Sequence, residues 1–173
     1  NANNITNNLV NASGGTYSDS IYLSNTNNNL VAGNVIQTSS ISALGINLIN
    51  SASNNISSNN ILTKGSYGYG VGITVNSLNN LVRNNIINTY QPSASGIYVS
   101  RSNYSNVKSN TITTYAGSAN GIHLSYGTNN NLTGNSILSN RSYGFYSIGS
   151  DGNQLVNNTF SSYFSAISLS SST

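Results

Sequence analysis

Apolar and polar positions alternate over short stretches of the chain, in a pattern that returns about every 25 residues. Six of the seven repeats contain the motif Asn-x-Φ-x-x-Asn-x-Φ, where Φ is apolar, as between Asn80 and Ile87, and the fifth has Ser105 in place of the first Asn. The first apolar position is occupied by Ile5, Val31, Ile56, Val82, Val107, Leu132 and Leu155. The second is occupied by Val10, Ile36, Ile61, Ile87, Ile112, Ile137 and Phe160. A period of two in such short segments predicts strands, and no stretch has the 3.6-residue period of an amphipathic helix.

A second motif, a small residue followed by Φ-x-Φ, closes each repeat and predicts a third strand. We align the copies Ser20–Leu23, Gly45–Leu48, Gly72–Val75, Gly96–Val99, Gly121–Leu124 and Ala166–Leu169. The sixth repeat, around residues 145–148, is irregular. One such strand buries little, but strands stacked from successive repeats share a core. The pattern therefore predicts an all-β fold, a right-handed parallel β-helix of about seven coils with three short strands each, forming a single domain over residues 1–173.

One Asn of the first motif is present in all seven repeats and has a structural explanation. The column consists of Asn8, Asn34, Asn59, Asn85, Asn110, Asn135 and Asn158. Asn tolerates the left-handed backbone of a sharp turn, and stacked amides can hydrogen-bond from coil to coil. We therefore predict a structural Asn ladder rather than a ligand site. In the same register, Ile61, Ile87 and Ile112 form a buried column, while Tyr98 and His123 point outward.

The segment between the second and third strands of each repeat varies most in length. Insertions in solenoids collect on one face, which is often the binding face. This segment carries Tyr17, Tyr67, Tyr69, Tyr90, Tyr115 and Tyr143, with Gly and Ser between them. From this set we predict Tyr67, Tyr69, Tyr90 and Tyr115 as glycan contacts.

With phrases such as Asn-Asn-Leu-Val-Arg-Asn-Asn-Ile at 79–86, the chain resembles the pectate-lyase-like superfamily of right-handed parallel β-helices. The repeats are similar to those of periplasmic copper-maturation proteins and of archaeal or bacterial surface proteins. The resemblance covers essentially the whole chain and implies the fold. It leaves function open, because the superfamily includes lyases, hydrolases, epimerases, tail spikes, adhesins and S-layer modules.

The scarcity of charge argues against catalysis, since only 4% of residues are charged and Asp19 and Asp151 are the two acids. The resemblance implies that lyases of this type use calcium held by several carboxylates, and hydrolases a group of Asp residues. Glycoside hydrolysis needs two carboxylates beside one bond, and Ca²⁺ needs several oxygen ligands. About five coils at ~4.8 Å place the two acids roughly 24 Å apart. We therefore expect no enzymatic activity, and a folding stability that hardly depends on pH.

Cofactors and several partner classes are also disfavoured. His123 is the one histidine, and there is no Cys or Met, so a copper or zinc site lacks ligands. The five Lys and Arg residues are scattered singly, which disfavours nucleic-acid binding. No stretch approaches the ~18 apolar residues of a membrane span. We expect no cofactor, no nucleic-acid partner and no membrane span.

The absence of Met indicates a processed or excised chain, which favours an extracellular or cell-surface location. Sequons for N-glycosylation occur at Asn4, Asn11, Asn55, Asn103, Asn131, Asn140 and Asn157. Their number is what chance gives in a chain in which Asn and Ser each make up about a fifth of the residues. Asn4, Asn55 and Asn131 precede an inward apolar residue and are expected to point outward, which is compatible with modification.

Two functions remain open. The repeat runs from near Asn1 to Leu169 without a capping segment. Uncapped coils expose strand edges, so the first expectation is a non-catalytic structural subunit that binds copies of itself head to tail in a surface fibre or layer. The alternative is a carbohydrate- or surface-binding module of a larger adhesin, with surface glycans as partners of the tyrosine-bearing segments.

Overall fold

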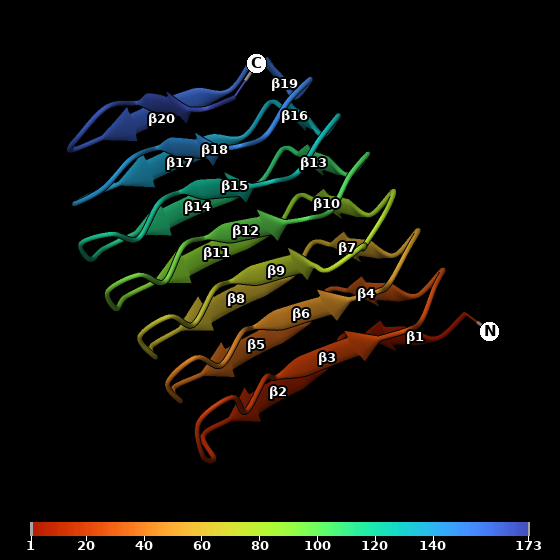
Figure 1. Cartoon of the computed structure of the whole chain (residues 1–173). Coiled ribbons are helices and arrows are strands. Elements are labelled where there is room, and N and C mark those ends of the chain that lie inside the picture. Colours follow the sequence, from red (N-terminus) through yellow and green to blue (C-terminus); the bar gives the residue numbers. More distant parts are fainter. Residues whose placement is uncertain (1, 173) are drawn as a thin grey trace.

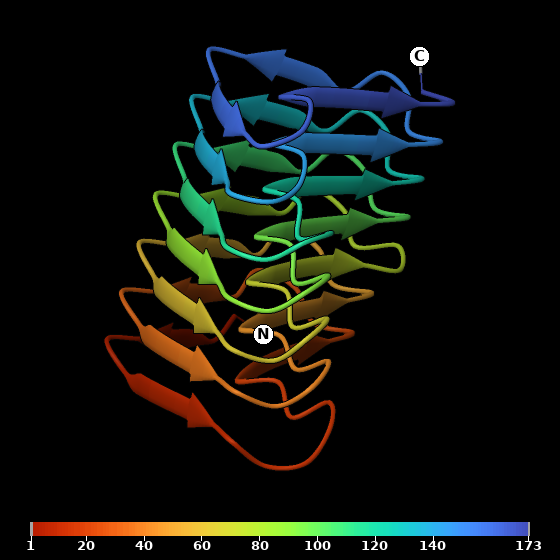
Figure 2. The same cartoon turned by 90° about the vertical axis from the view of Figure 1, so that its left-hand side faces the viewer.

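Every repeat folds into three short strands, and each strand pairs with its counterpart in the next repeat. In a computed structural model that describes residues 2–172, this stacking produces a parallel β-helix of seven coils and three sheets (Figures 1 and 2). The first sheet contains β1 (Asn4–Thr6), β4 (Leu30–Ala32), β7 (Asn55–Ser57), β10 (Leu81–Arg83), β13 (Asn106–Lys108), β16 (Asn131–Thr133) and β19 (Gln154–Val156). The second contains β2 (Leu9–Ala12), β5 (Val35–Thr38), β8 (Asn60–Thr63), β11 (Ile86–Thr89), β14 (Thr111–Thr114), β17 (Ser136–Ser139) and β20 (Thr159–Ser162). The third contains β3 (Ile21–Ser24), β6 (Ile46–Ile49), β9 (Val71–Thr74), β12 (Ile97–Ser100), β15 (Ile122–Ser125), β18 (Phe145–Ile148) and β21 (Ile167–Ser170).

The core is a tube of aliphatic columns that run parallel to the helix axis. Ile87 is aligned with Ile61 on one side and Ile112 on the other, and all three are buried. Tyr98 pairs with His123 at the outward position of the third sheet. The predicted fold, the core column and the outward position of these two rings are therefore confirmed.

The third copy of the Φ-x-Φ motif is two residues away from its predicted alignment. Val71, rather than Ile73, pairs with Ile46 and Ile97, so Gly72 takes the outward position. Val75, predicted to be inward, is 44% exposed. The predicted alignment was wrong because 71–73 and 73–75 alternate equally well, and the hydrophobic period alone cannot choose between them.

The irregular sixth repeat does form a strand of the third sheet. In β18, Phe145 and Ser147 point inward and Tyr146 outward, in register with Ile122, Leu124 and His123 of β15. The motif was not visible in the sequence because Ser147 stands where the other coils mostly have an aliphatic residue.

The predicted Asn ladder is present on the turns between the first and second sheets. The Asn59 amide donates to Oδ1 of Asn85, and the Asn85 amide donates to Oδ1 of Asn110, both at 3.0 Å. The same bond joins every neighbouring pair of the column at 2.8–3.0 Å. Each Oδ1 also accepts from the backbone N–H of the preceding coil's Asn.

The expectation that the ladder Asn itself adopts the left-handed backbone is wrong. The residue before it does so in every coil. These residues are Asn7, Gly33, Ser58, Asn84, Ser109, Gly134 and Asn157, with φ between 53° and 67°. The ladder Asn is thereby free to use its side chain for the amide stack, while its neighbour makes the turn.

A second Asn column lies before the first sheet and is interrupted once. The side-chain amides of Asn29, Asn54 and Asn80 are joined by hydrogen bonds from coil to coil, and the side-chain amide of Asn130 donates to Oδ1 of Asn153. Ser105 stands between the two segments, and its buried hydroxyl has no partner among residues 2–172.

Candidate functional site

Aromatic rings follow one another along the outward side of the third sheet. From the first coil to the last, the outward positions are Tyr22, Asn47, Gly72, Tyr98, His123, Tyr146 and Ser168. In-register parallel strands place equivalent side chains directly above one another. The ring centroids of Tyr98 and His123, and of His123 and Tyr146, are consequently 5.0 Å apart.

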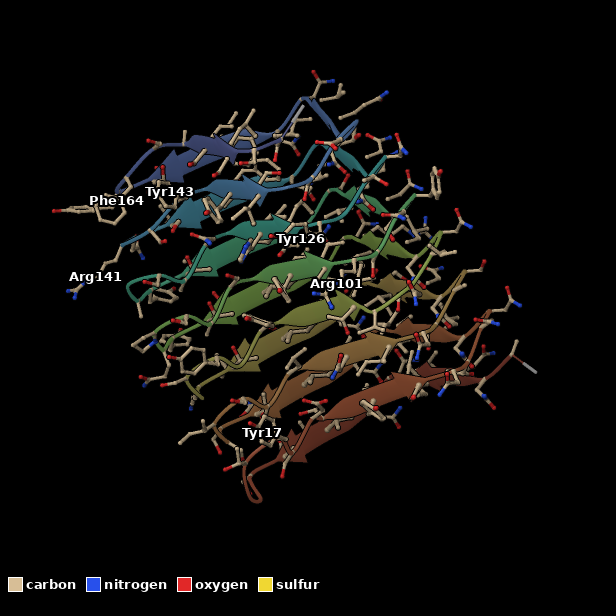
Figure 3. The ribbon with its side chains drawn as sticks, viewed as in Figure 1. Tyr17, Arg101, Tyr126, Arg141, Tyr143 and Phe164 are labelled. Carbon is tan, nitrogen blue, oxygen red and sulfur yellow. The ribbon has the colours of Figure 1, made fainter. Side chains whose placement is uncertain are left out.

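Rings from the loops between the second and third sheets extend this arrangement in both directions. Tyr69 lies 4.6 Å from Tyr98, measured between ring centroids. At the other end, Tyr143 lies 5.4 Å from Tyr146 and 5.8 Å from Phe164. Figure 3 shows Tyr143 and Phe164 together near the C-terminal end of the β-helix, with Tyr17 at the opposite end.

We call the connected set the aromatic row. It consists of Tyr69, Tyr98, His123, Tyr146, Tyr143, Phe164 and Tyr163. The row spans coils three to seven, so it is a surface built by the solenoid repeat rather than by one loop.

His123 is half-buried in the middle of the row. Burial lowers the pKa of its imidazole from 6.5 to about 4. Its Nε2 is buried and has no hydrogen-bond partner in the part of the chain that the structure describes. At neutral pH the side chain is therefore an uncharged aromatic ring that packs between Tyr98 and Tyr146. Burial also raises the pKa of the Tyr69 hydroxyl, with Tyr98 and Tyr67 adding to the effect.

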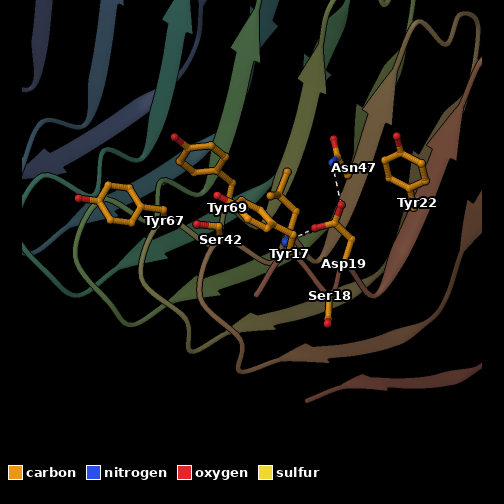
Figure 4. A pocket seen from close by; sticks show the side chains of 9 residues that line it. Tyr17, Ser18, Asp19, Tyr22, Ser42, Asn47, Tyr67 and Tyr69 are labelled. Atoms are coloured by element: carbon orange, nitrogen blue, oxygen red, sulfur yellow. Dashed lines mark hydrogen bonds between the residues drawn. The ribbon is translucent and has the colours of Figure 1, made fainter. Parts of the chain in front are cut away.

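A hollow of about 690 Å³ lies beside the row on the first three coils (Figure 4). We call it the tyrosine pocket; it is lined by Tyr17, Ser18, Asp19, Tyr22, Ser42, Leu44, Asn47, Tyr67 and Tyr69. The Asp19 carboxylate is held in place by two donors. Leu44 N–H donates to Oδ1 at 2.6 Å, and the Asn47 amide donates to Oδ2 at 2.7 Å.

A second hollow, of about 580 Å³, lies at the other end of the row. It is lined by Gly117, Ser118, Asn140, Arg141, Tyr163 and Phe164. Arg141 projects from the loop side of the β-helix near Phe164 (Figure 3). The aromatic row thus connects a hollow that contains a carboxylate with one that contains a guanidinium.

The structure brings together two of the four tyrosines predicted as glycan contacts. Tyr67 and Tyr69 both line the tyrosine pocket. Tyr90 and Tyr115 instead stack on each other, with centroids 4.4 Å apart and planes inclined by 10°, and belong to neither the pocket nor the row. The sequence prediction missed Tyr146 and did not connect Tyr98 and His123 to the loop tyrosines, although the outward positions of the third strand were a usable signal.

The predicted N-glycosylation sites differ in accessibility. Asn4, Asn11, Asn131, Asn140 and Asn157 are exposed, whereas Asn55 and Asn103 are half-buried. Oδ1 of Asn103 accepts the Thr128 N–H at 2.8 Å. Modification stays a prediction, and geometry favours the five exposed sites.

Residues 2–172 contain no cluster of three or more His, Cys, Asp or Glu side chains suited to a metal ion. Copper sites in proteins use imidazole, thiolate or thioether ligands. The one candidate, His123, has tyrosine rings as its neighbours on both sides. The donor set therefore does not fit a copper site. The same part of the chain has no helix long and apolar enough to cross a membrane.

Comparison with known proteins relates the chain to periplasmic β-helix proteins. The family model described as periplasmic copper-binding protein (NosD) matches residues 66–172. A crystal structure of the periplasmic alginate epimerase AlgG has a TM-score of 0.73 and 24% identity, covering 91% of this chain and 35% of the epimerase. A double mutant of that epimerase gives 0.70 and 26%, covering 84% and 33%. The chain therefore spans about a third of these epimerase chains. A comparison with curated proteins finds no match.

Proposed function

The chain belongs to the family described as periplasmic copper-binding protein (NosD), and we propose that it is a non-catalytic, extracytoplasmic β-helix that binds polysaccharide along the aromatic row. The observation that carries this proposal is the continuity of the row over five coils. An extracytoplasmic location is supported by the description of the related NosD and AlgG proteins as periplasmic.

The chemistry of the row suits a sugar chain. Aromatic side chains offer large, rigid apolar faces, and tyrosine adds a hydroxyl that can hydrogen-bond. Sugar rings are similarly two-sided, with C–H groups on their faces and hydroxyls at their edges. The coils repeat every ~4.8 Å, which is comparable to the length of one hexose unit in an extended chain. A polymer lying along the axis would therefore meet similar surroundings at each step.

The placement of the acids supports a binding role without catalysis. Asp19 lies in the tyrosine pocket on the first three coils, whereas Asp151 follows β18 near the other end. Polysaccharide cleavage through paired carboxylates needs both groups at one bond. Epimerase activity is a property of the AlgG enzymes, of which this chain covers only about a third.

Head-to-tail assembly into a fibre or layer stays a prediction. Ile5 and Val10 at one end, and Leu155 and Phe160 at the other, are only partly buried against the core. A second copy of the chain and further coils of the same chain would cover these edges equally well, so the edges favour neither. The aromatic row lies on the side of the solenoid and does not depend on what covers the ends.

Binding can be tested by affinity electrophoresis and calorimetry with soluble polysaccharides, including a neutral β-glucan, xylan and alginate. Tyr98→Ala and Tyr146→Ala should each weaken binding about three- to tenfold, because each removes one stacking ring. Tyr104→Ala is the matched control, since Tyr104 is 53% exposed and lies outside the row. Binding of none of the polymers, or equal losses in all three variants, would contradict the proposal.

A further inference from the structure

The tyrosine pocket has an unusual combination of rings and charge. Tyr17, Tyr22, Tyr67 and Tyr69 line the same hollow as the Asp19 carboxylate, and Tyr67 lies at the side away from Asp19 (Figure 4). The other lining residues are Ser, Asn and Leu, so Asp19 is the one charged side chain in the pocket wall. A ligand that enters the pocket therefore meets both a negative charge and tyrosine rings in the pocket wall.

The Asp19 carboxylate is oriented but has acceptor capacity left. Each of its oxygens accepts one hydrogen bond, from Leu44 N–H and from the Asn47 amide. A carboxylate offers about four lone-pair positions, so roughly half of them remain for a ligand. Neither of its two donors is charged, and no Lys, Arg or His lines the pocket. The protein supplies the orientation of the charge without supplying a cation beside it.

We propose that the tyrosine pocket binds the protonated amino group of an amino sugar, and so selects polysaccharides that contain free hexosamine units. An ammonium donates three hydrogen bonds, and its charge is attracted both to the carboxylate and to the faces of the tyrosine rings. The inference rests on the proposed function in one respect, because Tyr69 belongs to both the pocket and the aromatic row.

Charge complementarity favours this occupant over the two alternatives. A uronic acid unit would bring a second carboxylate next to Asp19, and like charges repel. A neutral sugar would remove water from the carboxylate without supplying an opposite charge, which leaves much of the desolvation cost uncompensated. A hexosamine supplies the charge and keeps the ring that stacks on tyrosine.

The experiment compares two oligosaccharides of equal length by calorimetry. One is a β-linked glucosamine oligomer at a pH where its amines are protonated, and the other is its fully N-acetylated form. The amine form should bind at least roughly tenfold more tightly, because a charge-assisted hydrogen bond is stronger than a neutral one. This preference should disappear in Asp19→Asn, persist in Asp151→Asn, which removes the other acid, and weaken as salt is added.

Asp19→Asn could also disturb the bonds to Leu44 and Asn47, so a second variant is needed. Tyr22→Leu keeps those bonds and removes a ring that is 55% exposed and lies outside the aromatic row. It should reduce affinity for the amine form more than for the N-acetylated form. Equal binding of the two forms, tighter binding of the N-acetylated form, no binding of either, or a preference that survives Asp19→Asn would overturn the inference.

The same titrations separate this inference from the proposed function. Tyr146→Ala alters the far part of the aromatic row and leaves the tyrosine pocket intact. If both forms bind equally and both weaken in Tyr146→Ala, the row binds sugar and the amine selection fails. If amine preference depends on Asp19 while Tyr146→Ala changes nothing, the pocket inference stands and binding along the row fails.

Discussion

Substitution of one ladder residue tests how much the Asn column contributes to stability. Asn85 is buried in the middle of the solenoid, and its side chain makes four hydrogen bonds. Its amide donates to the Ile56 carbonyl and to Oδ1 of Asn110, each at 3.0 Å. Its Oδ1 accepts from the backbone N–H of Asn59 at 2.9 Å and from the Asn59 amide at 3.0 Å.

Asn85→Ala removes all four bonds and leaves two donors of Asn59, its backbone N–H and its side-chain amide, without this acceptor in a buried turn. At about 1 kcal/mol for each bond, the expected loss is about 4 kcal/mol in the free energy of unfolding. Urea denaturation followed by circular dichroism measures it from the shift in midpoint at constant slope.

The neighbouring residue provides the control. Asn84 has φ = 55° and belongs to the left-handed turn rather than to the ladder. Asn84→Gly should stay within about 1 kcal/mol of the native protein, because Gly adopts this backbone readily. If Asn85→Ala and Asn84→Gly had equal and small effects, the column would reflect only the Asn-rich composition, and the reasoning would be refuted.

Three further changes follow from the same architecture. Ile87→Ala opens a cavity in the buried column and should cost about 2–5 kcal/mol in a urea titration, and no loss of stability would contradict the core register. Ser105→Asn should restore the interrupted second ladder, because the new side-chain oxygen offers Asn80 an acceptor. The free energy of unfolding should rise by about 1 kcal/mol. A lower urea midpoint would show that the site cannot hold the larger side chain. The sequence predicted a folding stability that hardly depends on pH, but His123 makes it depend on pH. Because burial lowers the pKa of His123 to about 4 in the folded protein, this imidazole takes up a proton only in the unfolded chain as pH falls from 6.5 toward 4. Stability should therefore fall by up to about 3 kcal/mol between pH 6.5 and 4, level off below, and show no such fall in His123→Phe.

The fold could be predicted because the information is repeated. Each coil independently specifies two apolar columns, and the shared spacing aligns Ile61, Ile87 and Ile112 without knowledge of the rest of the chain. Errors arose where one coil departed from the others. Val71-Gly72-Ile73 offers two equivalent alternations, and Ser147 takes an inward position without an apolar side chain. In both places the register is set by backbone pairing with the neighbouring coils. The hydrophobic pattern of a single coil does not contain this information.

The candidate site was less predictable because it depends on packing between a sheet and a loop. Gly72 is the decisive residue: a Cβ at this position would meet the side chain of Leu44, which covers the gap between Asn47 and Tyr98. Because the strand contributes no ring at this step, the neighbour of Tyr98 comes from the loop as Tyr69. Leu44 and Tyr69 are also walls of the tyrosine pocket. The missing side chain at position 72 therefore shapes the pocket and joins it to the aromatic row, a relation that exists only once the coils are stacked.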